Sequence, residues 1–168
     1  MLNAEYLLQK IAIFVATRWE LNAIRHAFVS DHMTTLKGFR CLFTKIHGHH
    51  IHLVQTGIGM EKAAEASRML FSEGRLDLVI ASGFAGALAP SSVGAFVVPD
   101  EIVSYIDDGT YDISSTITCN QKFRKIALDI AQLVSCDVLA GRLITVPRIM
   151  WLATQKKLLA DQLRAMAL

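Results

Sequence analysis

The stretch LDLVIASGFAGALAPSSVGAFVVPDEIV, residues 76–103, contains two apolar runs separated by a loop rich in small residues. Residues 78–99 carry no charge, and their length alone passes the roughly 20-residue criterion for a membrane-spanning helix. Gly83, Gly86 and Pro90 interrupt this run, so we instead expect two short strands with a loop between them. Glycines directly after a strand indicate that another group approaches the backbone closely. Phe84 is the one aromatic side chain in this loop.

Apolar runs and helical periodicities alternate along the rest of the chain. Residues 10–17 form a continuous apolar run, typical of a strand buried on both faces of a parallel or mixed sheet. The other expected elements are helices at 19–28, 60–74, 120–134 and 150–163, a hairpin at 39–57 turning near Gly48, and strands at 76–82, 95–107, 141–146 and from 164 onward. This alternation predicts the α/β class, and we expect a single domain over residues 1–168.

Composition and charge exclude several classes of protein. Apolar residues make up 52% of the 168 residues, which excludes a disordered chain, and the net charge of +2 without a Lys/Arg run argues against a nucleic-acid or membrane-surface partner. The apolar run near the N-terminus is too short for a signal peptide, so we expect a soluble, cytoplasmic protein. Cys41, Cys119 and Cys136 have no CxxC spacing and are expected to be reduced, buried thiols.

Candidate functional residues follow three of the expected strands. Arg18 and Glu20 follow the first strand, a Gly57-Ile58-Gly59 turn follows the hairpin, and the loop around Phe84 follows the third. In α/β sheets, ligands bind beyond the carboxyl ends of the strands. Each motif alone has a simpler explanation, because a lone GxG is commonly a tight turn and a glutamate in a first helical turn complements the helix dipole. Their occurrence at successive strand ends favours a binding site.

The segments IAIFVATRWEL, TGIGMEKAAEAS and LDLVIASGFAGALAPSSVGAFVVPDEIV together resemble the nucleosidases and phosphorylases that cleave purine nucleosides. The resemblance runs from about residue 10 to the end, with weaker matches at GRLITVPRIMW and the last residues. It implies a central mixed β-sheet flanked by helices and cleavage of an N-glycosidic bond by water or phosphate. It also implies a small-molecule nucleoside as partner, a homo-oligomer (dimer or hexamer), and no cofactor apart from phosphate as a co-substrate.

The resemblance also implies roles for individual residues. Glu20 matches the catalytic carboxylate that positions or activates water. The substrate-binding residues that it implies are Ile58 and Gly59 on the 5′ side of the sugar, Gly83, Phe84, Ala85 and Gly86 in the loop after the third strand, and Ile149 and Met150 against the purine. The phosphate-binding Arg of the hexameric phosphorylases, about three residues before Phe84, has no counterpart here, and Arg18 or Arg148 is the candidate replacement. On sequence alone, Ile149 and Met150 are equally well explained as core residues. Trp19 and Trp151 could also stack on a base, but we expect both to pack in the core or at its rim.

Two departures from the family pattern bear on function. Phe84 stands where most members have a Ser or Thr that contacts the nucleophile, so we expect altered specificity. The chain ends at Leu168, before the family's ribose-binding Met-Glu pair and the strand bearing the Asp that protonates the purine. We therefore expect that the C-terminal strands are missing relative to the family. The alternative function is a catalytically incompetent nucleoside-binding or assembly domain.

Two further readings are weaker. A dinucleotide-binding protein would need a GxGxxG motif after the first strand, and this sequence has none there. Four histidines lie in HGHHIH, residues 47–52, where His50 and His52 share one face of a strand. No cysteine or carboxylate lies nearby to complete a metal site, so we expect no metal.

Overall fold

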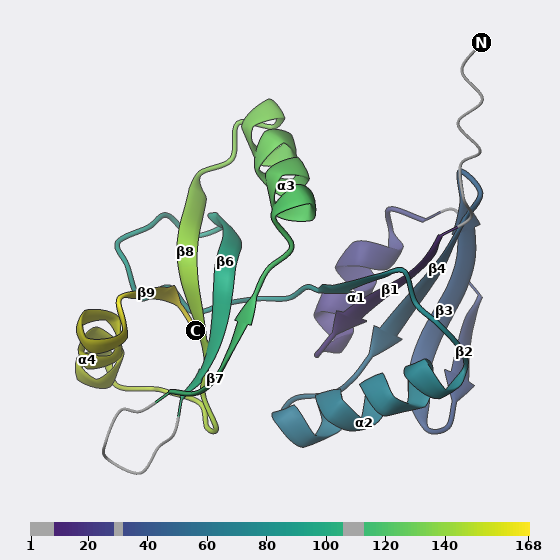
Figure 1. Cartoon of the computed structure of the whole chain (residues 1–168), viewed down its shortest axis with the longest axis horizontal. Helices are drawn as coiled ribbons and strands as arrows, with labels where there is room; N and C mark the ends of the chain where they lie inside the picture. The colour runs from purple at the N-terminus through teal and green to yellow at the C-terminus, as the bar shows by residue number, and fades with distance from the viewer. Residues whose placement is uncertain (1–8, 29–31, 106–112) are drawn as a thin grey trace. The chain divides into compact units, whose positions relative to one another are not determined.

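The computed structural model describes residues 9–28, 32–105 and 113–168 (Figure 1). The chain divides into two compact units, an N-terminal unit of residues 1–84 and a C-terminal unit of residues 85–168. The boundary between them falls inside the loop of small residues, directly after Phe84. The expectation of a single domain over residues 1–168 stays a prediction.

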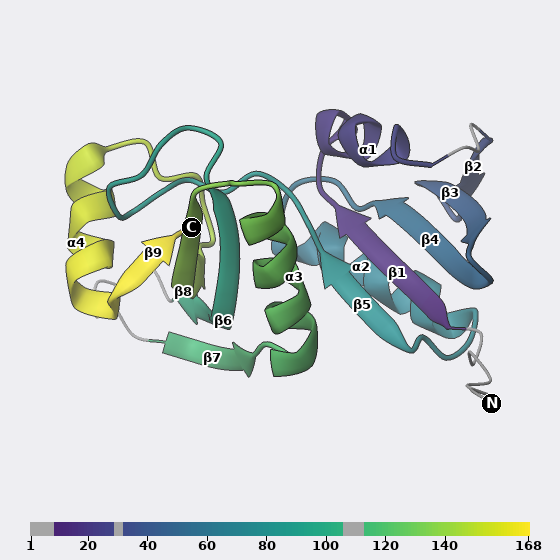
Figure 2. The same cartoon turned by 90° about the horizontal axis from the view of Figure 1, so that it is seen from above.

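The N-terminal unit is one mixed sheet with a helix on each face (Figure 2). Its strands run in the order β2-β3-β4-β1-β5, and β4, β1 and β5 are mutually parallel. Phe14 of β1 is therefore in register with Val54 of β4 and with Ala81 of β5. The elements are β1 (Lys10–Val15), α1 (Arg18–Arg25), β2 (Met33–Leu36), β3 (Phe39–Ile46), β4 (His49–Gln55), α2 (Met60–Ser72) and β5 (Leu78–Ala81).

Two hairpin turns and two apolar clusters hold this sheet together. Lys37-Gly38 and His47-Gly48 all have positive φ, as two-residue turns between antiparallel strands require. Each helix covers one face of the sheet with its own cluster. The cluster under α2 contains Ala12, Phe14, Cys41, Val54, Ala66, Met69 and Leu70, and the cluster under α1 contains Val15, Leu21, Leu42 and Leu53.

The C-terminal unit is a second mixed sheet, with strand order β7-β6-β8-β9. Strands β6, β8 and β9 are parallel, and β7 pairs with β6 in the antiparallel direction. Its elements are β6 (Phe96–Tyr105), β7 (Ile113–Thr118), α3 (Gln121–Leu133), β8 (Val138–Thr145), α4 (Ala153–Leu163) and β9 (Ala165–Ala167). The core of this unit lies under α4 and contains Val103, Tyr105, Ile144, Met150, Leu159, Leu163 and Ala165.

The α/β class with mixed sheets and flanking helices is confirmed, with the described strands divided over two sheets. Residues 78–99 form β5, a loop and the start of β6, as expected for a run interrupted by glycines. Among the described residues, no helix is long and apolar enough to cross a membrane. Strands β2 and β7 were missed because they are short and rich in Ser and Thr.

The three cysteines are free thiols, as expected, but not all are buried. Cys41 is buried, Cys119 is half-buried, and Cys136 is exposed just after α3, so the expectation of burial was wrong for Cys136. The apolar stripe expected on residues 120–134 is present but remains largely exposed, because α3 buries only its small Ala131.

Candidate functional site

The parallel strands β4, β1 and β5 bring three chain segments to one edge of the N-terminal sheet. The Thr56 amide donates to the Val15 carbonyl at 2.8 Å, and the Ser82 amide donates to the Phe14 carbonyl at 2.9 Å. The Gly57 amide donates to the Ala16 carbonyl at 3.1 Å. The segments that follow the three strands are thus hydrogen-bonded at the edge where the strands end, as expected for strands that run in the same direction.

Glu20 lies in the first turn of α1 at this edge, and its side chain is 7% exposed. Thr17 is the N-cap of α1, and its hydroxyl accepts a hydrogen bond from the Glu20 amide at 3.3 Å. In return, Oε2 of Glu20 accepts bonds from the Thr17 amide at 2.6 Å and the Thr17 hydroxyl at 2.9 Å. This reciprocal capping box fixes the carboxylate at the start of the helix.

The second carboxylate oxygen of Glu20 is held by the loop after β5. The Phe84 amide donates to Oε1 at 2.8 Å, across a separation of 64 residues. Gly83 allows this approach, since a Cβ at that position would lie 2.6 Å from Oε1 and 3.1 Å from Cδ of Glu20. The close approach expected at this glycine is therefore made by a carboxylate of the protein itself.

Opposing effects act on the pKa of Glu20. Burial raises the pKa, but hydrogen bonds from the amides of Phe84, Thr17 and Ala16 and from the Thr17 hydroxyl lower it, and the net result is a pKa below the ordinary value. The carboxylate is therefore ionised at neutral pH. Of about four lone-pair sites on a carboxylate, Oε1 uses one for the Phe84 amide, which leaves it able to accept a bond from a further donor.

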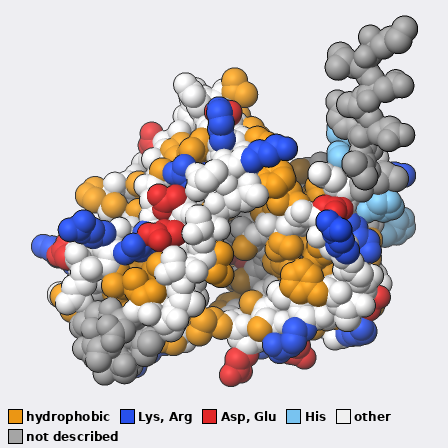
Figure 3. Space-filling model, in the orientation of Figure 1, with side chains coloured by type: hydrophobic (Ala, Val, Ile, Leu, Met, Phe, Trp, Pro, Cys, Tyr) orange, Lys and Arg blue, Asp and Glu red, His pale blue; other side chains and the backbone are white. Residues whose placement is uncertain are grey.

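The segments that follow the three strands also carry exposed side chains. Ile58 is 66% exposed in the turn after β4, and Phe84 is 81% exposed in the loop after β5. Gly59 is the N-cap of α2 with φ of 108°, a conformation that favours glycine. Arg18 is exposed at the first position of α1. Hydrophobic side chains accordingly reach the surface of this unit (Figure 3, orange).

Ala85 and Gly86 belong to the C-terminal unit, where the loop pairs with β9. The Gly86 amide donates to the Leu168 carbonyl at 2.6 Å, and the Leu168 amide donates back to Gly86 at 2.9 Å. Ala87 forms an antiparallel bridge with Ala167. A Cβ on Gly86 would meet its nearest neighbour, Cδ1 of Leu168, at an ordinary 3.5 Å, so Gly86 is not needed for close approach as Gly83 is.

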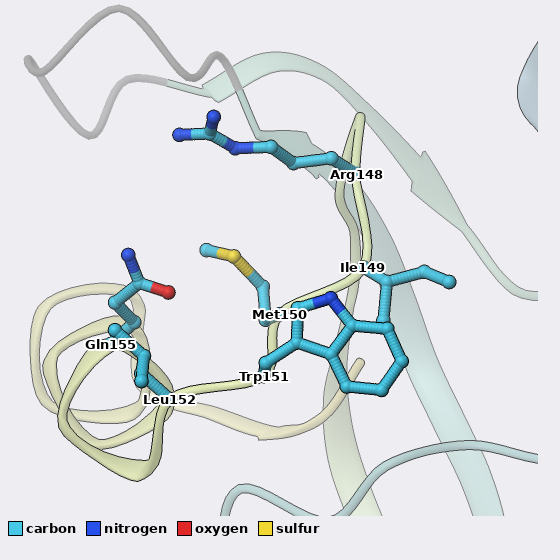
Figure 4. Close-up of a pocket in the computed structure, with 6 residues that line it drawn as sticks. All are labelled: Arg148, Ile149, Met150, Trp151, Leu152 and Gln155. Atoms are coloured by element: carbon cyan, nitrogen blue, oxygen red, sulfur yellow. The ribbon is translucent and has the colours of Figure 1, made fainter.

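Arg148, Ile149 and Met150 line a pocket of about 460 Å³ formed by the loop that follows β8 and the first turn of α4 (Figure 4). Met150 is buried and packs in the core of the unit, whereas Ile149 is 60% exposed. Trp151 and Gln155 complete the wall together with Leu152. Met150 is therefore a core residue that also reaches the pocket. Ile149 and Trp151 present apolar surface at the rim of the pocket.

The predicted residues are thus distributed over both units. Arg18, Glu20, Ile58, Gly59, Gly83 and Phe84 lie in the N-terminal unit, and Ala85, Gly86, Arg148, Ile149 and Met150 lie in the C-terminal unit. The sequence reasoning missed Thr17 and Gln155. The spacing Thr-x-x-Glu at residues 17–20, a capping-box signature, could have identified Thr17. Gln155 carried no such signal.

The histidines of the hairpin do not form a cluster in the described part of the chain. No three His, Cys, Asp or Glu side chains gather there in a metal-binding arrangement. His52 instead packs edge-on against Phe43, with ring centroids 4.9 Å apart. Its pKa is lowered by burial and by the nearby charges of Lys10 and His50.

Comparison with known proteins identifies the family. The sequence profile of the phosphorylase superfamily matches residues 10–168, and the chain belongs to this superfamily. A 94-residue segment is 32% identical to the 5′-methylthioadenosine/S-adenosylhomocysteine nucleosidase of Lysinibacillus sphaericus, covering 55% of this chain. That match spans only 41% of the length of the curated relative.

Solved structures show the same fold at lower identity. The nucleosidase of Neisseria meningitidis in complex with methylthio-immucillin-A superimposes with a TM-score of 0.84 at 20% identity, covering 95% of this chain and 74% of the other. The futalosine hydrolase of Helicobacter pylori gives a TM-score of 0.83 at 21% identity, with 96% and 77% coverage. At such identities the likeness establishes the fold.

Proposed function

We propose that the chain cleaves the N-glycosidic bond of a purine-type nucleoside. In hydrolysis, the bond between C1′ and the base nitrogen breaks, a water oxygen bonds to C1′, and the base leaves with a proton. In phosphorolysis, a phosphate oxygen takes the place of water. Membership of the phosphorylase superfamily and the activity named for the Lysinibacillus relative support this proposal.

The observation that carries the proposal is the fixed, ionised carboxylate of Glu20 at the ligand-binding edge of the sheet. A carboxylate with a lowered pKa is a weak proton acceptor, so its role is to orient the nucleophile through Oε1. Its negative charge also stabilises the positive charge that develops on the ribose in an oxocarbenium-like transition state. Because the capping box holds the charge in place, it needs no reorganisation during the reaction.

Phe84 supports an altered specificity. Its amide is committed to Glu20, and its phenyl ring cannot donate a hydrogen bond to a nucleophile. The exposed ring instead adds apolar surface to the loop whose amide binds the carboxylate, which suits an apolar group on the substrate. Within the C-terminal unit, the pocket at Ile149 and Trp151 has an apolar lining that suits a purine ring.

The second candidate function is a nucleoside-binding or assembly domain without catalysis. The observation that favours it is also Phe84, because a hydroxyl that contacts the nucleophile in most family members is replaced by a phenyl ring. This candidate predicts nucleoside binding without release of the base.

Release of adenine from 5′-methylthioadenosine, followed by chromatography with and without phosphate, tests the proposal. Release that is independent of phosphate indicates hydrolysis, and release that requires phosphate indicates phosphorolysis. Binding measured by calorimetry without any release would favour the second candidate. Neither binding nor release across a panel of purine nucleosides would contradict both.

A further inference from the structure

Thr17 is the one side chain, among the residues that the structure describes, that hydrogen-bonds to the Glu20 carboxylate. Its hydroxyl donates to Oε2 at 2.9 Å. The other donors to the carboxylate are the backbone amides of Thr17, Phe84 and Ala16. A substitution can therefore remove the Thr17 hydroxyl from this set and leave every backbone donor in the chain.

The Thr17 hydroxyl has two separable roles. Its oxygen accepts a bond from the Glu20 amide at 3.3 Å, which caps α1. A hydroxyl carries a single proton, and an ionised carboxylate can only accept, so that proton points at Oε2 of Glu20. A lone pair of the hydroxyl thus serves the helix, and its proton serves the carboxylate.

This proton decides how the carboxylate of Glu20 is turned. The last torsion of a glutamate side chain is broad, so hydrogen bonds rather than intrinsic barriers fix the direction of its two oxygens. Oε2 receives both the amide and the hydroxyl of Thr17, at 2.6 and 2.9 Å. Oε1 receives the Phe84 amide at 2.8 Å and is the oxygen left to accept from a nucleophile.

No neighbouring charge takes over if the hydroxyl is lost. Glu20 forms no ion pair with any residue that the structure describes, and Arg18, two positions earlier on α1, is exposed. The cluster between α1 and the sheet consists of apolar side chains, such as Leu42 and Leu53. Burial raises the pKa of Glu20, and only hydrogen bonds lower it. Each of these bonds therefore contributes directly to keeping the carboxylate ionised.

We propose that Thr17 is a positioning residue for the reaction, whose hydroxyl keeps the Glu20 carboxylate charged and turned so that Oε1 meets the nucleophile. The inference rests on the proposed function, because that function assigns the nucleophile to Glu20. Thr17 acts through Glu20. A residue that only capped the helix would affect the stability of the fold and not the pH dependence of the reaction.

The test is the pH dependence of kcat/KM for adenine release from 5′-methylthioadenosine. Thr17→Val removes the hydroxyl and keeps a similar shape. Loss of a bond that favours the ionised form should raise the lower pKa of the profile by about one unit and reduce kcat at neutral pH about tenfold. Thr17→Ser keeps the hydroxyl and should restore both quantities to near the wild-type values.

Two further variants separate positioning from helix capping. In Thr17→Asp, an ionised aspartate accepts from the Glu20 amide as a good N-cap but has no proton for Oε2, so the lower pKa should rise at least as far as in Thr17→Val. Asn120 caps α3 through bonds from the amides of Lys122 and Phe123, at 3.1 and 3.4 Å. Asn120→Ala should therefore lower the urea midpoint, as a lost cap does, and leave the pH profile unchanged.

The outcomes separate this inference from the proposed function. An unchanged lower pKa in folded Thr17→Val and Thr17→Asp would make Thr17 a helix cap alone and overturn the inference, with the proposed function left standing. An equal shift in Asn120→Ala, or no recovery in Thr17→Ser, would overturn it as well. If wild type releases no base from any purine nucleoside, the proposed function fails and the inference fails with it.

Discussion

Replacement of Gly83 by alanine should destabilise the N-terminal unit through Glu20. The new Cβ would lie 2.6 Å from Oε1 and 3.1 Å from Cδ, well inside a normal carbon–oxygen contact. The carboxylate cannot move away without loss of the capping box, because Oε2 is bound to the amide and hydroxyl of Thr17. The loop must therefore shift and lose the bond from the Phe84 amide to Oε1.

The size of the effect follows from that displacement. A hydrogen bond to a charged group contributes about 1.5–3 kcal/mol, and overpacking of a tight site costs about 1–3 kcal/mol. Both figures describe the same shift and are not added, so the free energy of unfolding should fall by about 2 kcal/mol. Urea unfolding of the whole chain measures this change, and adenine release should fall in parallel.

Gly86→Ala is the matched control, because its Cβ would meet only ordinary contacts with Leu168. It should change the free energy of unfolding by less than about 0.5 kcal/mol. A Gly83→Ala variant as stable as wild type, or no less stable than Gly86→Ala, would refute the claim that Gly83 exists to admit the Glu20 carboxylate.

Three further predictions concern other parts of the chain. Folding lowers the pKa of Glu20, so its ionised form stabilises the fold above the ordinary glutamate pKa of about 4.3, and this stabilisation is lost as the pH falls through the lower folded pKa. The difference in free energy of unfolding between wild type and Glu20→Gln should therefore be constant near neutral pH and become smaller in acid. A difference that grows in acid would contradict the lowered pKa. Burial keeps Cys41 protonated by raising the pKa of its thiol, so a thiol reagent should modify exposed Cys136 far faster in the native state, and comparable rates by mass spectrometry would contradict the structure. Arg142 donates to Glu101 and to the last carbonyl of α4, both at 2.7 Å, so Arg142→Met should cost about 1–3 kcal/mol in urea unfolding, and a neutral result would exclude a role for these bonds in stability.

The sequence predicted the helices and strands better than the contacts that explain individual residues. Strands β1, β4 and β5 were predictable because continuous apolar runs and a glycine turn mark buried strands. Strands β2 and β7 escaped because their Thr- and Ser-rich sequences carry little apolar periodicity. Helix α1 carried a readable N-terminal signal, the Thr17 and Glu20 pair.

The strand-end positions of the candidate residues were predictable, but their contacts were not. The parallel order of β4, β1 and β5 explains why Ile58, Glu20 and Phe84 follow strand ends at one edge. The contact of Gly83 with Glu20 links residues more than sixty positions apart, and no local pattern reveals such a pair.

The most direct test of the central claim compares adenine release from 5′-methylthioadenosine by wild type and by Glu20→Gln. The substitution removes the charge and places an amide donor against the N–H groups that now bind the carboxylate. Glu73→Gln, an exposed glutamate at the far end of α2, controls for the chemical change. The account predicts a loss in kcat of roughly 10²–10³-fold for Glu20→Gln and less than about twofold for Glu73→Gln, with both variants folded by circular dichroism. Release by folded Glu20→Gln at the wild-type rate would contradict the assignment of Glu20 as the catalytic carboxylate.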